Sequence, residues 1–180
     1  MNLHGKILIL SILSIIGCKK QKIMNIEKTL KTVEYVDIER FMGDWYVIAN
    51  IPTFIEKNAC NAIESYKLNA KGEIQTTFSF YQDSPNGKRK EYNPKGYIYN
   101  TETNAEWRMQ FIWPFKMPFL IIDLDTNYSY TVIGVPNRKY VWIMARDAQI
   151  PSDTYLKITQ KLAGIGYDIS KIQNILQEWD

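Results

Sequence analysis

Eight short segments with the composition of β-strands follow one another along most of this chain. Each is rich in β-branched and aromatic residues and ends at a turn signal, such as Lys71-Gly72 or Pro85-Asn86-Gly87. Most connections are tight, which favours antiparallel neighbours, because parallel strands need crossovers of about a dozen residues or more. The segments cover residues 45–51, 63–68, 74–81, 96–100, 106–112, 119–124, 130–135 and 140–145. This pattern predicts an all-β domain, either a barrel or a sandwich.

The two ends of this strand array favour a closed, eight-stranded, antiparallel up-and-down β-barrel. Gly43-x-Trp45 opens the first strand and Arg146 follows the last, and barrel closure makes these strands neighbours. The turn 126–128, between the sixth and seventh strands, falls at the same end. We therefore expect five residues to meet at a closed base: Gly43, Trp45, Thr126, Tyr128 and Arg146. A guanidinium over an indole contributes about 0.5–2 kcal/mol, so we assign these residues a structural role.

The rest of the domain is predicted to lie outside the barrel. Ser152 is placed as a helix N-cap, and an apolar stripe follows at helical spacing, formed by Ile158, Leu162 and Ile165. We expect this C-terminal α-helix to pack on the outer wall. Residues 169–179 predict a short strand or turn and then a helical end. With no second-domain boundary, residues 36–180 are assigned to one barrel domain.

Residues 1–17 have the features of a secretory signal peptide. Their apolar run, 7–16, is shorter than the about 20 residues of a transmembrane helix but suits a signal sequence. It ends in Ile15-Ile16-Gly17-Cys18, which resembles the bacterial lipoprotein cleavage box. The resemblance implies that Cys18 becomes a lipidated N-terminus held in the membrane by its acyl chains, with residues 18–35 as a lipidated tether.

The composition excludes several kinds of site. His4 is the only histidine and lies in the predicted signal peptide, so the mature chain would have no Ser-His-Asp site and no histidine-ligated metal. With Cys18 lipidated, Cys60 is the one remaining thiol, and no intrachain disulfide forms. The net charge of +3, with acids and bases interleaved, does not indicate a nucleic-acid partner. We predict no metal, no cofactor and no catalytic residue.

Alternation along the strands sorts side chains between the two faces of the barrel. It gives an apolar and aromatic inner set on the first, fifth and eighth strands: Val47, Ala49, Trp107, Met109, Phe111, Tyr140 and Trp142. An eight-stranded barrel either fills itself with side chains or holds one small ligand, and each of these residues is compatible with both. The small residues Val47 and Ala49 leave room, which favours an acyl chain or a similar long apolar ligand.

One connection at the open end is unusually apolar. It reads Trp113-Pro114-Phe115-Lys116-Met117-Pro118, and such patches mark contact surfaces. It suits membrane lipid, a second subunit in a homodimer, or the protruding end of a ligand. The other open-end loops are predicted at 52–62 and 82–95. Four basic residues near this rim are candidates for attracting a phosphate or carboxylate head group: Lys57, Lys88, Arg89 and Lys116.

The residues at the closed end resemble a known family. Gly43-x-Trp45, Thr126-Asn127-Tyr128 and Arg146 look like the three conserved motifs of the lipocalins, with Asn127 in place of the usual aspartate. The runs 43–49, 113–115, 123–128 and 140–146 are more specifically similar to the bacterial outer-membrane lipoprotein lipocalins and their apolipoprotein D-like relatives. The resemblance implies a lipid-anchored lipocalin of the cell envelope, in the outer membrane of a Gram-negative bacterium. Its implied function is to carry or store a fatty acid, a lysophospholipid or a similar small lipid.

Two other functions are compatible with the same sequence. A barrel filled by side chains would act as an interaction protein that docks a partner through residues 113–118. A lipocalin-type isomerase or epoxide enzyme would need acidic residues such as Asp123 or Glu64 inside the barrel, with raised pKa values. We favour a non-enzymatic binding protein, because the mature sequence lacks histidine and its predicted inner set holds no paired carboxylates.

Overall fold

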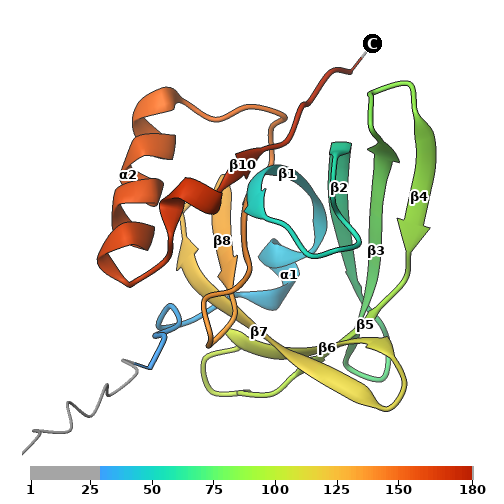
Figure 1. The fold of residues 1–180 in the computed structure, drawn as a ribbon. Helices are drawn as coiled ribbons and strands as arrows, with labels where there is room; N and C mark the ends of the chain where they lie inside the picture. The colour runs from blue at the N-terminus through green and yellow to red at the C-terminus, as the bar shows by residue number, and fades with distance from the viewer. Residues whose placement is uncertain (1–28, 180) are drawn as a thin grey trace, which may run out of the picture.

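The computed structural model describes residues 29–179, in which one antiparallel sheet curves into a closed barrel (Figure 1). The strands are β1 (Gly43–Ile51), β2 (Ala59–Leu68), β3 (Glu73–Gln82), β4 (Lys88–Tyr92), β5 (Lys95–Ile98), β6 (Glu106–Ile112), β7 (Phe115–Leu124), β8 (Tyr130–Gly134), β9 (Val141–Ala145) and β10 (Gln173–Asn174). β4 and β5 both pair with β3 and together take the fourth strand position, and β1 pairs with β9 to close the barrel. The predicted eight-stranded antiparallel barrel is confirmed.

Three strands reach further toward the open end than the sequence pattern indicated. β2 and β7 begin inside stretches predicted as loops, and β4 lies within the predicted loop 82–95. The ladder between β2 and β3 runs to the pair Ala59 and Gln82, and Gln82 also pairs with Lys88 of β4. Backbone pairing with β3 therefore extends β2 and forms β4, although much of β4 is polar and exposed, and pairing of Phe115 with Ile112 of β6 extends β7.

The helix α2 (Ser152–Gly164) lies on the outside of the barrel, as predicted (Figure 1). Its buried residues, Ile158 and Leu162, belong to an outer cluster that also contains Val132 and Ile143 of the barrel wall. The N-cap residue is Pro151, which makes no side-chain cap hydrogen bond, and Ser152 is the first helical residue. The predicted Ser152 cap is therefore wrong.

The C-terminal tail ends in extended structure rather than in a helix. After the 3-10 turn η1 (Ile169–Lys171), β10 pairs with β1, and Leu176 forms a bridge with Cys60 of β2. The side-chain nitrogen of Gln177 donates to the carbonyl oxygen of Val47 at 2.9 Å. The predicted helical end is wrong, because pairing with β1 and β2 satisfies the backbone of this segment instead.

The residues just before the barrel lie against its outer wall. Leu30 is buried, and its Cδ2 would lie 3.1 Å from a Cβ placed on Gly134, at the open-end terminus of β8. At the other end, the Val36 amide donates to the carbonyl of Thr103 at 2.8 Å. This N-terminal strap, residues 30–36, runs along the barrel from near the open end to the closed end. Residues 30–35 of the predicted tether are thus packed onto the domain.

The predicted signal peptide, residues 1–17, and the predicted lipidation site, Cys18, lie outside the described residues. The tether is described only from residue 29 onward. Between residues 29 and 179, no helix has the length and apolar character needed to cross a membrane.

Aromatic side chains fill the closed end of the barrel. The short helix α1 (Ile38–Phe41), capped by Asp37, brings the buried Phe41 into this end. The Phe41 ring centroid lies 5.0 Å from that of Trp45 and 5.2 Å from that of Trp107. These rings belong to an inner cluster within the barrel, which is separate from the outer cluster beneath α2.

Candidate functional site

The guanidinium of Arg146 binds the carbonyl groups that surround the closed end. Nη1 donates to the carbonyl oxygen of Asp44 at 2.7 Å. Nη2 donates at 2.8, 3.1 and 2.8 Å to three successive carbonyl oxygens, those of Arg40, Phe41 and Met42. The Arg146 Cζ lies 3.7 Å from the Trp45 ring centroid, and the Trp45 Nε1 donates to the Phe41 carbonyl at 2.9 Å. One guanidinium therefore joins the end of β9 to the start of β1.

The turn between β7 and β8 reaches the same end. The Tyr128 hydroxyl accepts a hydrogen bond from the Asp37 amide at 2.8 Å, and Arg40 donates to the Thr126 carbonyl at 3.2 Å. Gly43 has a φ of +94°, which side-chain-bearing residues rarely adopt, and the residue leads β1 out of the base. The three sequence segments that carry the predicted closed-end residues thus lie together around α1.

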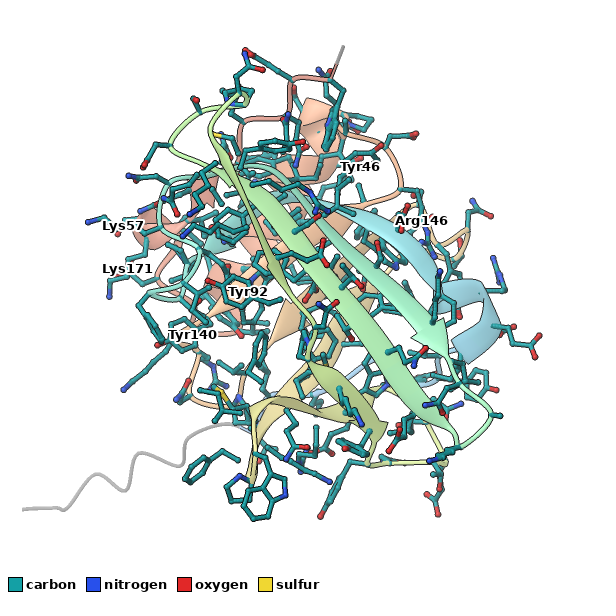
Figure 2. The ribbon with its side chains drawn as sticks, turned by 90° about the vertical axis from the view of Figure 1, so that its right-hand side faces the viewer. Tyr46, Lys57, Tyr92, Tyr140, Arg146 and Lys171 are labelled. Carbon is teal, nitrogen blue, oxygen red and sulfur yellow. The ribbon has the colours of Figure 1, made fainter. Side chains whose placement is uncertain are left out.

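A cavity of about 250 Å³ opens at the other end of the barrel. Figure 2 shows its lining residue Tyr140 far from Arg146, on the opposite side of the molecule. Four of the predicted pocket residues line it: Met109, Phe111, Tyr140 and Trp142. The rest of the wall is mainly apolar and includes Phe78, Phe119 and Val135. The barrel therefore contains space for a small apolar ligand.

The other three predicted pocket residues lie in the packed core. Val47 and Trp107 are buried in the inner cluster. Ala49 is buried in the outer cluster, together with residues of α2. Val47 and Ala49 pair with consecutive residues of β9, so Ile48 is an extra residue in a β-bulge and the alternation inverts after it. The prediction that Ala49 faces inward is therefore wrong.

Two carboxyl groups line the cavity, although neither was in the predicted pocket set. One belongs to Glu56, in the loop after β1. Its Oε2 accepts hydrogen bonds from Asn50 Nδ2 at 2.7 Å and Trp142 Nε1 at 2.8 Å, and its Oε1 accepts one from Thr53 Oγ1 at 2.8 Å. Burial raises the pKa of Glu56 above its usual value, and these three hydrogen bonds oppose the rise. Glu56 thereby ties the mouth loop to β1 and β9.

The second carboxyl group belongs to Glu64, which is only 8% exposed. It pairs with Trp45 across the ladder between β1 and β2, so it shares the inner face. The Tyr66 hydroxyl donates to its Oε2. Burial raises the pKa of Glu64 from 4.5 to about 7; the Tyr66 hydrogen bond opposes this rise and the nearby Glu56 charge adds to it. The alternation of side chains along β2 could have placed Glu64 on the inner face, whereas Glu56 lies in a loop, where no such periodicity exists.

Asp123 and Cys60 do not line the cavity. Asp123 was the other acid named for an enzymatic function. It forms an ion pair with Lys161 of α2 at 2.7 Å on the outside of the barrel. Cys60 is buried as a free thiol. In the described part of the chain, no three or more His, Cys, Asp or Glu side chains are grouped so that they could hold a metal ion.

Large apolar side chains surround the mouth of the cavity in solvent. Phe54 is 90% exposed and Trp113 is 81% exposed, and Ile112 and Phe115 are exposed as well. We call these four residues the mouth patch. Three of them, Phe54, Ile112 and Phe115, also line the cavity, so apolar surface is continuous from the interior to the rim.

Comparison with known proteins decides the family. Residues 36–177 match the family model described as a lipocalin-like domain. This chain belongs to the lipocalin family. The lipocalin is 31% identical to temperature-induced lipocalin-1 of Arabidopsis thaliana over 163 residues, with 86% of each chain covered. It is 24% identical to the outer membrane lipoprotein Blc of Vibrio cholerae, over 86% of its own length and 91% of that protein.

Further relatives agree with this assignment. The lipocalin is 27% identical to mouse apolipoprotein D, over 77% of its own length and 76% of that protein. Among solved structures, insecticyanin from the tobacco hornworm Manduca sexta superposes with a TM-score of 0.65 at 19% identity, covering 84% and 85% of the two chains. This structural likeness shows the shared fold. The predicted resemblance to bacterial outer-membrane lipoprotein lipocalins and their apolipoprotein D-like relatives is confirmed.

Proposed function

We propose that this lipocalin binds a fatty acid, a lysophospholipid or a similar small lipid in its barrel and carries or stores it in the cell envelope. The observation that supports this most is the apolar cavity of about 250 Å³ at the end opposite the aromatic base. Burial of an acyl chain there is favourable by about 25 cal/mol for each Å² of apolar surface removed from water. The function needs no chemical step on the ligand.

We also propose that the protein is anchored through a lipidated Cys18, after removal of residues 1–17. The sequence of the cleavage box supports this, and one relative is named an outer membrane lipoprotein. An anchored carrier would work at the surface from which its ligand comes. We accordingly propose the outer membrane of a Gram-negative bacterium as its location.

The cavity also bears on the two alternatives. An open apolar cavity argues against a barrel filled by its own side chains. Glu64 meets the requirement of the enzymatic alternative for a buried carboxyl with a raised pKa, but Glu56 accepts three hydrogen bonds that hold the mouth loop. We therefore assign the pair to binding rather than to catalysis.

Filling the cavity is expected to abolish ligand binding. In a Val135→Trp variant, the larger side chain would take up space that the ligand needs, at a stability cost of about 1–3 kcal/mol for overpacking. Native mass spectrometry of residues 19–180 should show the wild-type protein with one bound lipid per barrel. The variant should bind that lipid at least about tenfold more weakly.

The matched control is Leu156→Trp, on the exposed side of α2, which should retain wild-type binding. A wild-type protein that carries no lipid and binds neither fatty acids nor lysophospholipids would contradict the proposed function. Equal binding by Val135→Trp would show that the ligand lies elsewhere.

We propose that the mouth patch contacts the lipid bilayer, so that a ligand passes between membrane and cavity without crossing water. The patch is apolar, exposed and continuous with the cavity, and the N-terminal strap begins near the same end of the barrel, where Leu30 lies beside Gly134. One cation lies beside the patch: the Lys116 ammonium, 3.6 Å from the Tyr97 ring centroid, is on β7 next to Phe115. Interfacial aromatic residues with neighbouring cations are typical of surfaces that lie on membranes.

The double variant Trp113→Ser/Phe115→Ser is expected to lower partitioning onto phosphatidylglycerol-containing vesicles severalfold, since it removes two exposed apolar groups. Sedimentation of residues 19–180 with the vesicles would measure this. The control is Leu68→Ser, an exposed apolar residue at the closed end, which should leave partitioning unchanged. Unchanged partitioning of the double variant, together with loss of a dimer, would assign the patch to a second subunit instead.

A further inference from the structure

The ionisable groups inside the cavity are all acidic. Of the described residues that line it, Glu56 and Glu64 carry ionisable carboxyl groups, and none is a lysine, arginine or histidine. A ligand carboxylate or phosphate placed inside would find no cation there and would face two acids. Because an unpaired charge in an apolar environment is costly, such a head group belongs outside, at the mouth.

The two carboxyl groups differ in what they have left to offer a ligand. Both oxygens of Glu56 are engaged, by Asn50, Trp142 and Thr53. Glu64 has one oxygen, Oε2, engaged by Tyr66. Its other oxygen, Oε1, accepts no hydrogen bond from any residue between 29 and 179. A carboxyl oxygen can accept two hydrogen bonds, so Oε1 of Glu64 is free to accept hydrogen bonds from a ligand in a cavity whose wall is mainly apolar.

The neighbours of Glu64 explain why no side chain of the protein donates a hydrogen bond to its Oε1. Its cross-strand neighbours are Trp45 on β1 and Phe78 on β3. The single donor of Trp45, Nε1, is engaged by the Phe41 carbonyl, and phenylalanine has no donor. The charged or titratable groups that act on Glu64 are Tyr66 on its own strand and Glu56 from the mouth loop. A buried acceptor oxygen without a donor from the protein is stabilised when a ligand donates a hydrogen bond to it.

We propose that Glu64 receives a hydrogen bond from the ligand, and that this lipocalin prefers amphiphiles whose buried group is a hydroxyl or an amine over those with a carboxylate. This inference rests on the proposed function and specifies the ligand class for the same cavity. The ligand enters with its donor group at Oε1 of Glu64, and its hydrocarbon portion lies against the aromatic wall. An anionic head group, when a ligand carries one, remains at the mouth.

The experiment compares three ligands of equal chain length: dodecylamine, 1-dodecanol and dodecanoate. Isothermal titration calorimetry with residues 19–180, at a pH above the Glu64 pKa of about 7, should show the amine and the alcohol binding at least about tenfold tighter than the acid. As the pH falls through that value, the preference for the amine over the alcohol should shrink. A structural Glu64 that never touches ligand would not produce this pH-dependent discrimination.

The variant Glu64→Gln makes the test sharper. Its amide oxygen can still accept from Tyr66, and its amide nitrogen would then present a donor to the cavity. We expect the order of affinities to reverse toward dodecanoate and the pH dependence of the preference to disappear. Glu64→Leu should bind all three ligands with little discrimination, and Glu102→Gln, in an exposed turn, should behave as wild type.

The outcomes separate this inference from the proposed function. If dodecanoate binds the wild-type protein as tightly as the amine and the alcohol, or if Glu64→Gln leaves the order unchanged, the inference is wrong while lipid binding stands. If none of the three ligands, no lysophospholipid and no co-purified lipid binds, the proposed function fails and the inference fails with it. Discrimination by the wild-type protein tests the inference even if a variant does not fold.

Discussion

Replacing Trp45 with alanine is expected to lower the free energy of unfolding by about 3–5 kcal/mol, as for other large truncations in protein cores. The side chain is fully buried, and its ring centroid lies 5.0 Å from that of Phe41 and 3.7 Å from the guanidinium carbon of Arg146. Its loss also removes the hydrogen bond from Nε1 to the Phe41 carbonyl. The expected cost is large because this one residue of β1 packs against both α1 and the arginine that follows β9.

Urea unfolding followed by circular dichroism would measure this change. The matched control is Trp179→Ala, which removes an exposed indole whose ring meets Tyr46 edge-on. This control should cost about 1 kcal/mol or less, in the range for surface substitutions. If the two variants unfold at similar denaturant concentrations, the closed end does not carry the stability that its packing indicates.

Replacing Glu64 with glutamine is expected to stabilise the protein above neutral pH. The pKa of Glu64 rises from 4.5 in the unfolded chain to about 7 in the folded protein, chiefly through burial, so the folded state binds the proton more tightly. The stabilisation from that proton is fully present below pH 4.5 and is lost as the pH rises through about 7, and its total is about 3 kcal/mol at 1.36 kcal/mol per pKa unit. The neutral amide in the variant avoids this loss.

The measurement is the free energy of unfolding of both proteins across this pH range. Wild-type stability should fall by more than that of Glu64→Gln, so that the variant becomes the more stable protein on the alkaline side. Part of the slope remains in the variant, because burial also raises the pKa of Glu56. The exposed substitution Glu102→Gln should reproduce the wild-type curve. Parallel curves for wild type and Glu64→Gln would mean that water reaches Glu64.

Periodicity explains why the barrel could be predicted from the sequence. Alternation with a period of two residues, interrupted by turn signals, identifies strands without knowledge of their partners, and barrel closure follows from the residues at the two ends. Strand ends were less predictable, because Lys88 and Phe115 are placed in strands by pairing with β3 and β6 rather than by their own side chains. The same holds for the tail, where pairing with β1 prevails over any helical tendency.

The pocket was predicted only in part, and the reason is local. Met109, Phe111, Tyr140 and Trp142 line the cavity as predicted, although the pairing of β6 with β7 shifts register between Met109 and Ile112 and brings the adjacent residues Phe111 and Ile112 both to the lining. Ala49 does not, because a bulge is a feature of backbone pairing that leaves no mark in the hydrophobic pattern. Glu64 was considered only as an acid that an enzymatic function would need inside the barrel, because the predicted inner set was drawn from apolar residues of the first, fifth and eighth strands.

The course of the N-terminal strap has a consequence for the proposed membrane anchor. Leu30 lies beside the open-end terminus of β8, and ten residues, 19–28, connect Thr29 to Cys18. An anchor at Cys18 would therefore hold the barrel from the side on which the cavity opens. Binding of the mouth patch to the bilayer would then be intramolecular. Its strength would depend on the effective concentration set by the connecting residues, which is on the order of millimolar for a short linker. Even a mouth patch with weak intrinsic affinity would spend much of its time at the lipid surface.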